Sequence, residues 1–258
     1  MKDIRAVYFD LDDTLCAYWA ASRRALRQAI EEAGLKTTTE DAVQAWRDVF
    51  PAFSKEIKTD AWYAHYLESG EPTRTEHIRR TLTAIGEFDE SLASRISARY
   101  AELRNEYLQL FPDALPVLNT LRGKHRLGLI TNGPADIQRQ EIARLGIEEF
   151  FEHILIEGEF KIGKPNRAIF EEAEAENGLK PEQMLFVGNA YEHDVQGAKN
   201  AGWWALWLNR GNESRNEDPP YPDAEIKHLY EVCDWLGIER PDETAPTPEA
   251  ELVKNWRG

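Results

Sequence analysis

Short apolar runs alternate with amphipathic helical patterns over much of the chain. Residues 4–9 form an apolar run rich in β-forming side chains, which predicts a buried strand. From residue 112 onward, helical patterns at 114–122, 135–145, 167–176 and 191–201 each lead into an apolar run, namely RLGLIT, HILI, MLFVG and WWALWL. Strands that alternate with helices predict right-handed crossovers and a mostly parallel sheet.

Residues 16–111 have a different character, because helical patterns separated by polar breaks follow one another there without a convincing strand. In RRALRQAIEEAG, for example, the apolar residues fall on one helical stripe that ends at Gly34. The sequence therefore predicts an α/β core domain built from residues 1–15 and 112–240, with an all-helical domain at 16–111 inserted after the first strand. Residues 241–258 are rich in Pro, Thr and Glu, and we expect a mobile tail there.

The chain of 258 residues has a formal net charge of −15. Such a chain repels polyanions, so we expect neither a nucleic acid polymer nor an anionic membrane surface as a partner. The spacing of its two cysteines, Cys16 and Cys233, indicates no disulfide framework. The N-terminus lacks the apolar core of a signal peptide, and no apolar run approaches the ~18–20 residues of a membrane span. These features predict a cytoplasmic protein and leave its oligomeric state open.

Three carboxylates follow the first predicted strand directly, in FDLDDTL. Residues two apart in an extended segment face the same side, so Asp10 and Asp12 can point into one pocket while Asp13 turns away. In parallel sheets of this kind, ligands bind outside the carboxyl ends of the strands. Further polar residues stand near the other predicted strand ends, namely Thr131 and Asn132 after RLGLI, Lys164 before a helix, and Asn189, Glu192 and Asp194 after MLFV.

Together these positions supply a carboxylate pair, a hydroxyl, a cation and further oxygen ligands, a set that favours phosphoryl transfer. A phosphate ester is an anion, and a divalent cation held by oxygen ligands would relieve its repulsion from the aspartates. Asp10 would attack phosphorus as a carboxylate nucleophile. Asp12 would protonate the leaving oxygen and then deprotonate the attacking water. Lys164 and Thr131 would stabilise negative charge on the phosphoryl oxygens.

The same segments resemble the motifs of the haloacid dehalogenase superfamily, in its phosphatase branch with a helical cap inserted after the first motif. FDLDDTL is similar to the first motif, LITNG to the second, GKP to the third and VGNAYEHDVQGAKNAG to the fourth. The resemblance implies an α/β fold with a Rossmann-like parallel sheet core flanked by helices and an inserted all-helical cap domain. It also implies Mg²⁺-dependent hydrolysis of a small-molecule phosphate monoester through an aspartyl-phosphate intermediate.

By this resemblance Asp10 is the nucleophile and Asp12 is the general acid and base. The resemblance also assigns two sets of ligands: the phosphoryl group to Thr131, Asn132 and Lys164, and Mg²⁺ to Asp10, the backbone carbonyl of Asp12, Asn189 and Asp194. The chain departs from the family at position 189, where the family has Asp and this chain has Asn189. A neutral amide removes one negative charge from the metal ligands, so we expect weaker Mg²⁺ binding. Glu192 or Asp194 could compensate, although we expect Glu192 to face solvent.

Substrate contacts are expected at Tyr18 and Trp19, because these aromatic residues follow the catalytic loop directly. Two other functions stay open. A 2-haloacid dehalogenase would direct Asp10 at carbon without a metal, but Asp12 argues against it because a halide leaving group needs no proton. A low-activity binding protein on the same fold is the other alternative, and Asn189 is its only support.

Overall fold

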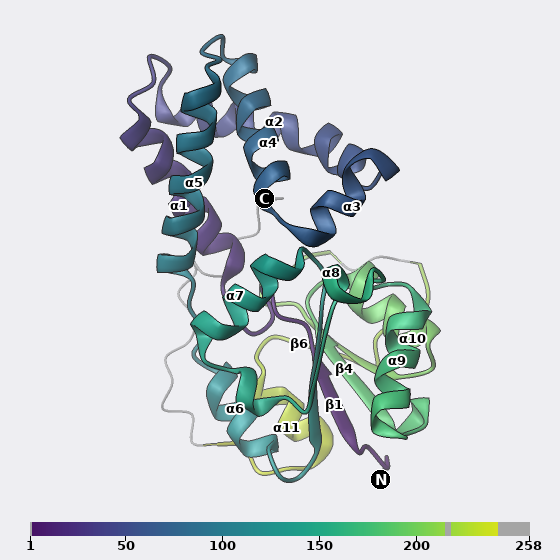
Figure 1. Ribbon diagram of the computed structural model, residues 1–258. Coiled ribbons are helices and arrows are strands. Elements are labelled where there is room, and N and C mark those ends of the chain that lie inside the picture. Colours follow the sequence, from purple (N-terminus) through teal and green to yellow (C-terminus); the bar gives the residue numbers. More distant parts are fainter. Residues whose placement is uncertain (1, 215–217, 242–258) are drawn as a thin grey trace.

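The computed structural model describes residues 2–214 and 218–241. It contains a sheet with helices on both faces and a helical segment above it (Figure 1). The tail predicted at 241–258 lies outside the described residues from position 242 on. Within the described part of the chain, no helix is long and apolar enough to cross a membrane.

The sheet has six parallel strands in the order β3-β2-β1-β4-β5-β6. The strands are β1 (Ala6–Phe9), β2 (Arg126–Thr131), β3 (His153–Ile156), β4 (Met184–Gly188), β5 (Trp204–Leu208) and β6 (Ala224–Ile226). β1 lies between β2 and β4, where Ala6 pairs with both Arg126 and Met184. All four residues of β1 are buried, as a strand covered on both faces requires. The predicted parallel sheet is thus confirmed.

Helices cover both faces of the sheet (Figure 1). These helices are α6 (Ala114–Leu121), α7 (Ala135–Leu145), α8 (Glu157–Phe160), α9 (Arg167–Asn177), α10 (Gly197–Asn200) and α11 (Tyr230–Leu236). Val7 and Phe9 of β1 belong to a core cluster with residues of α6 and α11, whereas Ala6 and Tyr8 belong to a second cluster with residues of α9 and α10. This alternation follows from the two-residue repeat of a strand, and it fixes β1 between two apolar layers.

Between β1 and α6 the chain forms a helical segment, which we define as residues 18–107. Its helices are α1 (Tyr18–Ala33), α2 (Thr39–Ile57), α3 (Asp60–Glu68), α4 (Glu71–Ala84) and α5 (Glu90–Tyr107). α1, α2, α4 and α5 share a hydrophobic cluster of their own, which includes Leu26, Trp46, Ile78 and Leu103. The helical segment therefore has an apolar cluster of its own, whereas Ala21 of α1 belongs to the cluster that contains Val7 and Phe9 of β1.

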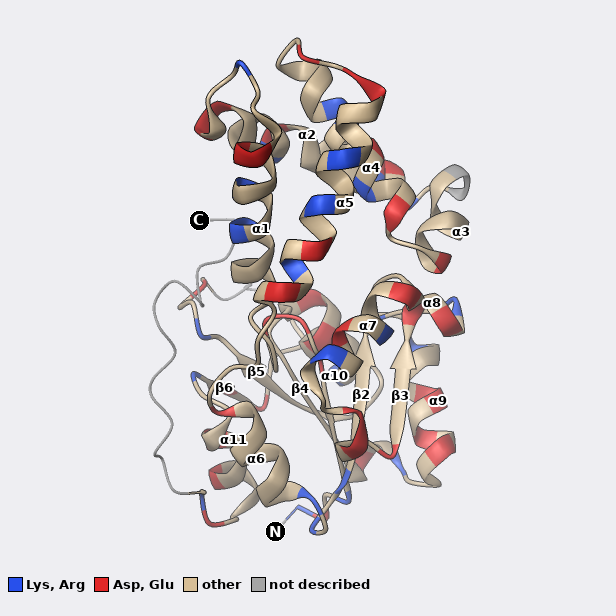
Figure 2. Cartoon of the chain, turned by 60° about the vertical axis from the view of Figure 1, so that its left-hand side comes forward, with Lys and Arg blue, Asp and Glu red and all other residues tan. Residues whose placement is uncertain are grey.

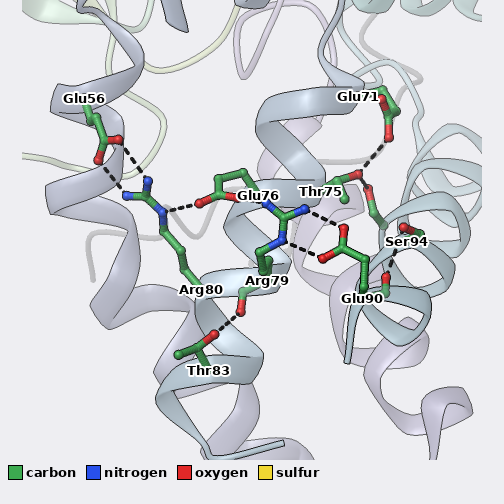
Figure 3. Close-up of polar contacts among 10 residues, drawn as sticks. Glu56, Glu71, Thr75, Glu76, Arg79, Arg80, Thr83, Glu90 and Ser94 are labelled. Carbon is green, nitrogen blue, oxygen red and sulfur yellow. Dashed lines mark hydrogen bonds and ion pairs between the residues drawn. The ribbon is translucent and has the colours of Figure 1, made fainter. Parts of the chain in front are cut away.

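Ion pairs on α4 connect three helices of this segment (Figure 3). Arg80 donates to both carboxylate oxygens of Glu56 on α2, at 2.6 and 2.9 Å, and to Glu76 on its own helix. Arg79 pairs with Glu90 at the start of α5. These groups are partly exposed, so each pair contributes little alone, and the two arginines act mainly as links between helices.

The chain enters and leaves the helical segment along two adjacent connections. The backbone N–H of Phe111 donates to the carbonyl of Leu15 at 2.9 Å, and the N–H of Ala17 donates to the carbonyl of Gln109 at 3.0 Å. The helical segment is therefore attached to the sheet directly after β1, on the side where the strands end.

Three elements differ from the sequence prediction. β6 and the helix α11 that follows it were not predicted, since β6 has only three residues and one buried apolar side chain, Ile226. The helix predicted at 191–201 begins instead as a π-helical turn over Tyr191–Gln196 and continues as α10. Wide turns of this kind are frequent at functional sites.

Candidate active site

The carboxyl ends of β1, β2 and β4 bring the predicted site residues together. Asp10 follows β1 directly, and its N–H donates to the carbonyl of Val187 in β4 at 3.0 Å. Thr131 is the last residue of β2, and Asn189 follows β4. The connections from β1 and β4 leave the sheet on opposite sides of this point, which is where ligands bind in open parallel sheets.

Lys164 bridges two aspartates at the centre of the site. Its Nζ lies 2.7 Å from Oδ1 of Asp10 and 2.7 Å from Oδ1 of Asp194, and all three side chains are at least nine-tenths buried. Burial lowers the pKa of the Lys164 ammonium, but the two carboxylates outweigh this effect and raise it above its usual value. Burial also raises the pKa of Asp10, to about 6, although Lys164 opposes that rise. The ion pair with Lys164 favours the ionised form of Asp10.

Thr14 links Asp10 to Asn189. The Thr14 hydroxyl lies 3.1 Å from Oδ2 of Asp10 and 3.3 Å from Oδ1 of Asn189, and it accepts a hydrogen bond from the Asn189 N–H. Asp194 comes from the π-helical turn, where its Oδ2 accepts the N–H of Ala190 at 2.8 Å. Glu192 is exposed, as expected.

Asp12 is held by a glutamine of α7. Nε2 of Gln138 donates to Oδ2 of Asp12 at 3.2 Å and to Glu141 at 3.2 Å, while its Oε1 accepts the hydroxyl of Thr131 at 2.6 Å. Burial and the neighbouring Asp10 raise the pKa of Asp12 to about 7, even though the bond from Gln138 lowers it. At neutral pH Asp12 can therefore both donate and accept a proton.

The remaining predicted residues surround these two aspartates. The Asn132 side chain donates to the Lys164 carbonyl at 2.7 Å and accepts the Lys164 N–H at 2.8 Å, so it braces the loop that carries the lysine. Asp13 turns away from Asp10, and its Oδ1 accepts the N–H of Trp19 at the start of α1.

A cavity of about 390 Å³ lies between the helical segment and the sheet. Asp12, Asn132 and Gln138 contribute to its lining from the sheet side, whereas Asp10 is not among the lining residues. Tyr18 and Trp19, the predicted substrate contacts, both line it. Other aromatic side chains of the helical segment line it too, including Phe53, Tyr63, Tyr66 and Tyr100. The cavity therefore combines an aromatic wall with the polar groups at the strand ends.

Several groups at the site were not among the predicted site residues. Gln138 and Glu141 of α7 lie on the side of Asp12, where Gln138 donates to both carboxylates. Arg104 of α5 lines the cavity, and its Nη2 lies 3.5 Å from Oε1 of Glu141. A sequence signal existed for Arg104, because it continues the helical stripe of Ile96 and Tyr100, where apolar side chains are expected. Gln138 carries no comparable signal.

The oxygen atoms at the strand ends fit a hard divalent cation such as Mg²⁺. Asp10 and Asn189 each place a side-chain oxygen near the same Thr14 hydroxyl, and Asp10 shares Lys164 with Asp194. Carboxylate and amide oxygens are ligands that Mg²⁺ accepts. A cluster of three or more His, Cys, Asp or Glu groups suited to a metal is absent from the described residues, so any such site depends on the amide of Asn189 and on backbone oxygens as well.

Comparison with known proteins gives a consistent result. A family model described as haloacid dehalogenase-like hydrolase matches residues 4–202. Glyceraldehyde 3-phosphate phosphatase from Methanopyrus kandleri is 33% identical over 239 residues, covering 90% of this chain and 96% of that protein. Among solved structures, the HAD hydrolase YfnB from Bacillus subtilis bound to magnesium has a TM-score of 0.74 at 22% identity, covering 92% of this chain and 100% of its own. A 2-haloacid dehalogenase from Pseudomonas syringae has a TM-score of 0.63 at 28% identity, covering 91% and 98%.

Proposed function

This chain belongs to the haloacid dehalogenase-like hydrolases and is a phosphatase of that superfamily, and from this premise we propose that it hydrolyses a small phosphate monoester through an aspartyl-phosphate on Asp10. The observation that carries the mechanism is the pairing of Asp10 with Lys164 beside Asp12. The two aspartates have different surroundings, and different surroundings let two carboxyl groups take different roles.

In the first half of the reaction, an oxygen of Asp10 attacks phosphorus while the bond from phosphorus to the ester oxygen breaks. Asp12 gives its proton to that leaving oxygen, so an alcohol departs. In the second half, Asp12 takes a proton from water as the water attacks the phosphorus of the aspartyl-phosphate, which releases phosphate and restores Asp10. Lys164 lies close enough to Asp10 to stabilise the phosphoryl oxygens, and Gln138 keeps Asp12 in place.

A Mg²⁺ ion would be held by Asp10, the backbone carbonyl of Asp12, Asn189 and Asp194. When bound, it would supply positive charge against the negative charge of the phosphoryl group. This assignment is supported by the side-chain oxygens of Asp10 and Asn189 near Thr14 and by the carboxylate of Asp194 near Lys164.

We assign the helical segment to the role of a cap. The cavity lies between this segment and the strand ends, so a bound ester would be shielded from bulk water during attack. A cavity of about 390 Å³ favours small phosphate esters over phosphorylated proteins.

The test is a screen of small phosphate esters with Mg²⁺, comparing the wild type with Asp10→Asn. We expect phosphate release from the wild type and a loss of at least ~1,000-fold with Asp10→Asn, since the nucleophile is removed. Asp3→Asn is the matched control, because Asp3 is exposed near the opposite end of β1. Equal turnover by Asp10→Asn and wild type would refute the mechanism.

The structural likeness to the Pseudomonas syringae enzyme is the observation behind the alternative function of a 2-haloacid dehalogenase. In that reaction Asp10 would attack carbon and displace halide, and Asp12 would have no proton to deliver. Chloride release from 2-chloropropionate in the presence of EDTA would support this alternative. A binding protein without activity would instead show no turnover across the ester panel.

A further inference from the structure

Two arginines of the helical segment line the cavity without a hydrogen-bonded carboxylate. Arg74 lies on α4 and Arg104 on α5. Nε of Arg74 donates to the carbonyl and the hydroxyl of Ser97, at 3.2 and 3.1 Å. These contacts occupy one edge of the guanidinium, and no ion pair joins Arg74 to a carboxylate among the described residues.

Arg104 is only 3% exposed, yet its Nε and Nη2 atoms have no hydrogen-bond partner among the described residues. Nη2 forms a buried ion pair with Oε1 of Glu141, but the two atoms are 3.5 Å apart, beyond the ~2.7–2.9 Å of a charge-assisted hydrogen bond. That carboxylate oxygen also lacks a hydrogen-bond partner among the described residues. The guanidinium carbon lies 5.6 Å from the ring centre of Tyr18 and 6.0 Å from that of Tyr100. A buried guanidinium with unpaired donors is costly, so a ligand that accepts these hydrogen bonds would bind favourably.

Three other arginines of the same helices, Arg79, Arg80 and Arg99, form ion pairs with glutamates. Arg79 and Arg80, on α4 beside Arg74, each bind carboxylate oxygens (Figure 3). The chain has 46 Asp and Glu residues against 31 Lys and Arg, and acidic residues occur throughout both parts of the molecule (Figure 2). The chain therefore has many carboxylates of its own, but Arg74 and Arg104 do not donate hydrogen bonds to them. Both arginines line the same cavity. Burial lowers the pKa of Arg74, and the positive charge of Arg104 lowers it further.

We propose that Arg74 and Arg104 bind a carboxylate on the leaving group, so that the substrate is a phosphorylated carboxylic acid. This inference rests on the proposed phosphatase function and names the substrate class of the same site. The planar forks of guanidinium groups match a carboxylate, which is also a small organic anion suited to the cavity. Asp12 lines the same cavity, so the carboxylate binds on the leaving-group side of the ester bond. The aromatic wall at Tyr18 and Tyr100 packs against the carbon skeleton.

The test uses three-carbon phosphate esters that differ at one end. 3-Phosphoglycerate ends in a carboxylate, glycerol 3-phosphate ends in a hydroxymethyl group, and glycerol 1,3-bisphosphate ends in a second phosphate. We expect kcat/KM of the wild type to be at least roughly tenfold higher for the carboxylate than for the alcohol. Arg74→Gln should reduce that preference roughly tenfold or more, mainly through KM, and change kcat/KM for glycerol 3-phosphate by less than about threefold.

Arg104→Lys is a second variant, since it keeps a buried positive charge but removes the planar fork. We expect it to weaken the carboxylate preference as well. Arg95→Gln is the matched control, because Arg95 is an exposed arginine on α5 that does not line the cavity. Equal losses for both esters in Arg74→Gln, no preference in the wild type, or a preference for the bisphosphate would each overturn the proposal.

A binding measurement separates this inference from the proposed function. Asp10→Asn cannot form the aspartyl-phosphate, so its melting temperature with added 3-phosphoglycerate reports binding alone. We expect a rise in the Asp10→Asn protein and a smaller rise in Asp10→Asn/Arg74→Gln. Equal rises would overturn the anion site even if no ester is hydrolysed. Asp10-dependent hydrolysis without a carboxylate preference would overturn the anion site and leave the phosphatase function standing.

Discussion

At the scale of single residues, Asn189 stands where we propose a ligand of Mg²⁺, and its neutral amide adds no negative charge to the strand ends. Its backbone is fixed by neighbours: the N–H donates to Thr14 at 3.1 Å, and the carbonyl accepts Nε1 of Trp207 at 2.9 Å. Its side-chain oxygen lies 3.3 Å from the Thr14 hydroxyl, which is also 3.1 Å from Oδ2 of Asp10. A change of the side chain at position 189 would therefore alter charge more than position.

We expect Asn189→Asp to lower the Mg²⁺ concentration for half-maximal activity by roughly tenfold, because an ionised ligand replaces a neutral one. The measurement is a Mg²⁺ titration of ester hydrolysis by wild type and variant. Asn200→Asp, which adds the same charge at an exposed position outside the site, should behave like the wild type. An identical metal dependence in Asn189→Asp and wild type would remove position 189 from the metal ligands.

At the scale of elements, the pattern of apolar and polar residues predicted most strands of the sheet and the polar residues that follow them. The apolar runs predicted β1 to β5, because buried parallel strands need apolar residues on both faces. It did not predict β6, whose buried surface is a single side chain, or the π-helical turn that presents Asp194, because six residues cannot distinguish a π turn from an α turn. The bond from Gln138 to Asp12 joins residues 126 positions apart, and it depends on how α7 packs.

His77 of α4 is buried against α2, and its surroundings disfavour protonation. His77 is 6% exposed, it stacks on Trp46 with ring centres 4.2 Å apart, and Nε2 lies 2.9 Å from the Trp46 carbonyl. Burial lowers the pKa of His77 to about 4, below its value of about 6.5 in an unfolded chain. Between these two values the unfolded chain binds more protons, so the free energy of unfolding falls as the pH falls.

We expect the buried His77 to lower the free energy of unfolding by roughly 2 kcal/mol at pH 5 relative to pH 7. Urea unfolding at both pH values should show a smaller difference for His77→Gln than for the wild type. His228→Gln provides the control, since His228 is exposed. If His77→Gln and His228→Gln have the same pH dependence as the wild type, protonation of His77 does not destabilise the fold.

The helical segment and the sheet core meet through close contacts that sequence periodicity does not predict. Tyr63 of α3 donates to Glu157 at 2.6 Å, and the N–H of Gly70 donates to Asp136 of α7 at 3.1 Å. A Cβ atom on Gly158 would lie 2.4 Å from the carbonyl oxygen of Leu67 in α3 and 2.3 Å from the N atom of Ala135 in α7. Glycine at position 158 thus permits the approach of α3 to the core.

We expect Gly158→Ala to displace α3, raise KM and reduce kcat/KM roughly tenfold, together with a loss of about 1–3 kcal/mol in stability. Gly128→Ala is the matched control. Its Cβ would lie 2.1 Å from the ring of Tyr8, within the second core cluster of the sheet, so it should cost stability without changing KM. Steady-state kinetics below the melting temperature of both variants distinguish the two effects. An unchanged KM in Gly158→Ala would show that this contact does not set the fit of the cap.

The central position of β1 has a consequence for synthesis on the ribosome. Its neighbours in the sheet, β2 and β4, are translated more than a hundred residues later, because Ala6 pairs with Arg126 and Met184. The helical segment contains its own apolar cluster and can pack as soon as residue 107 has emerged, whereas β1 waits with its apolar side chains unpaired. Nascent chains halted when residue 107 has left the ribosome, but before β2 has, should therefore already protect α1 to α5 from protease while β1 remains accessible to chaperones.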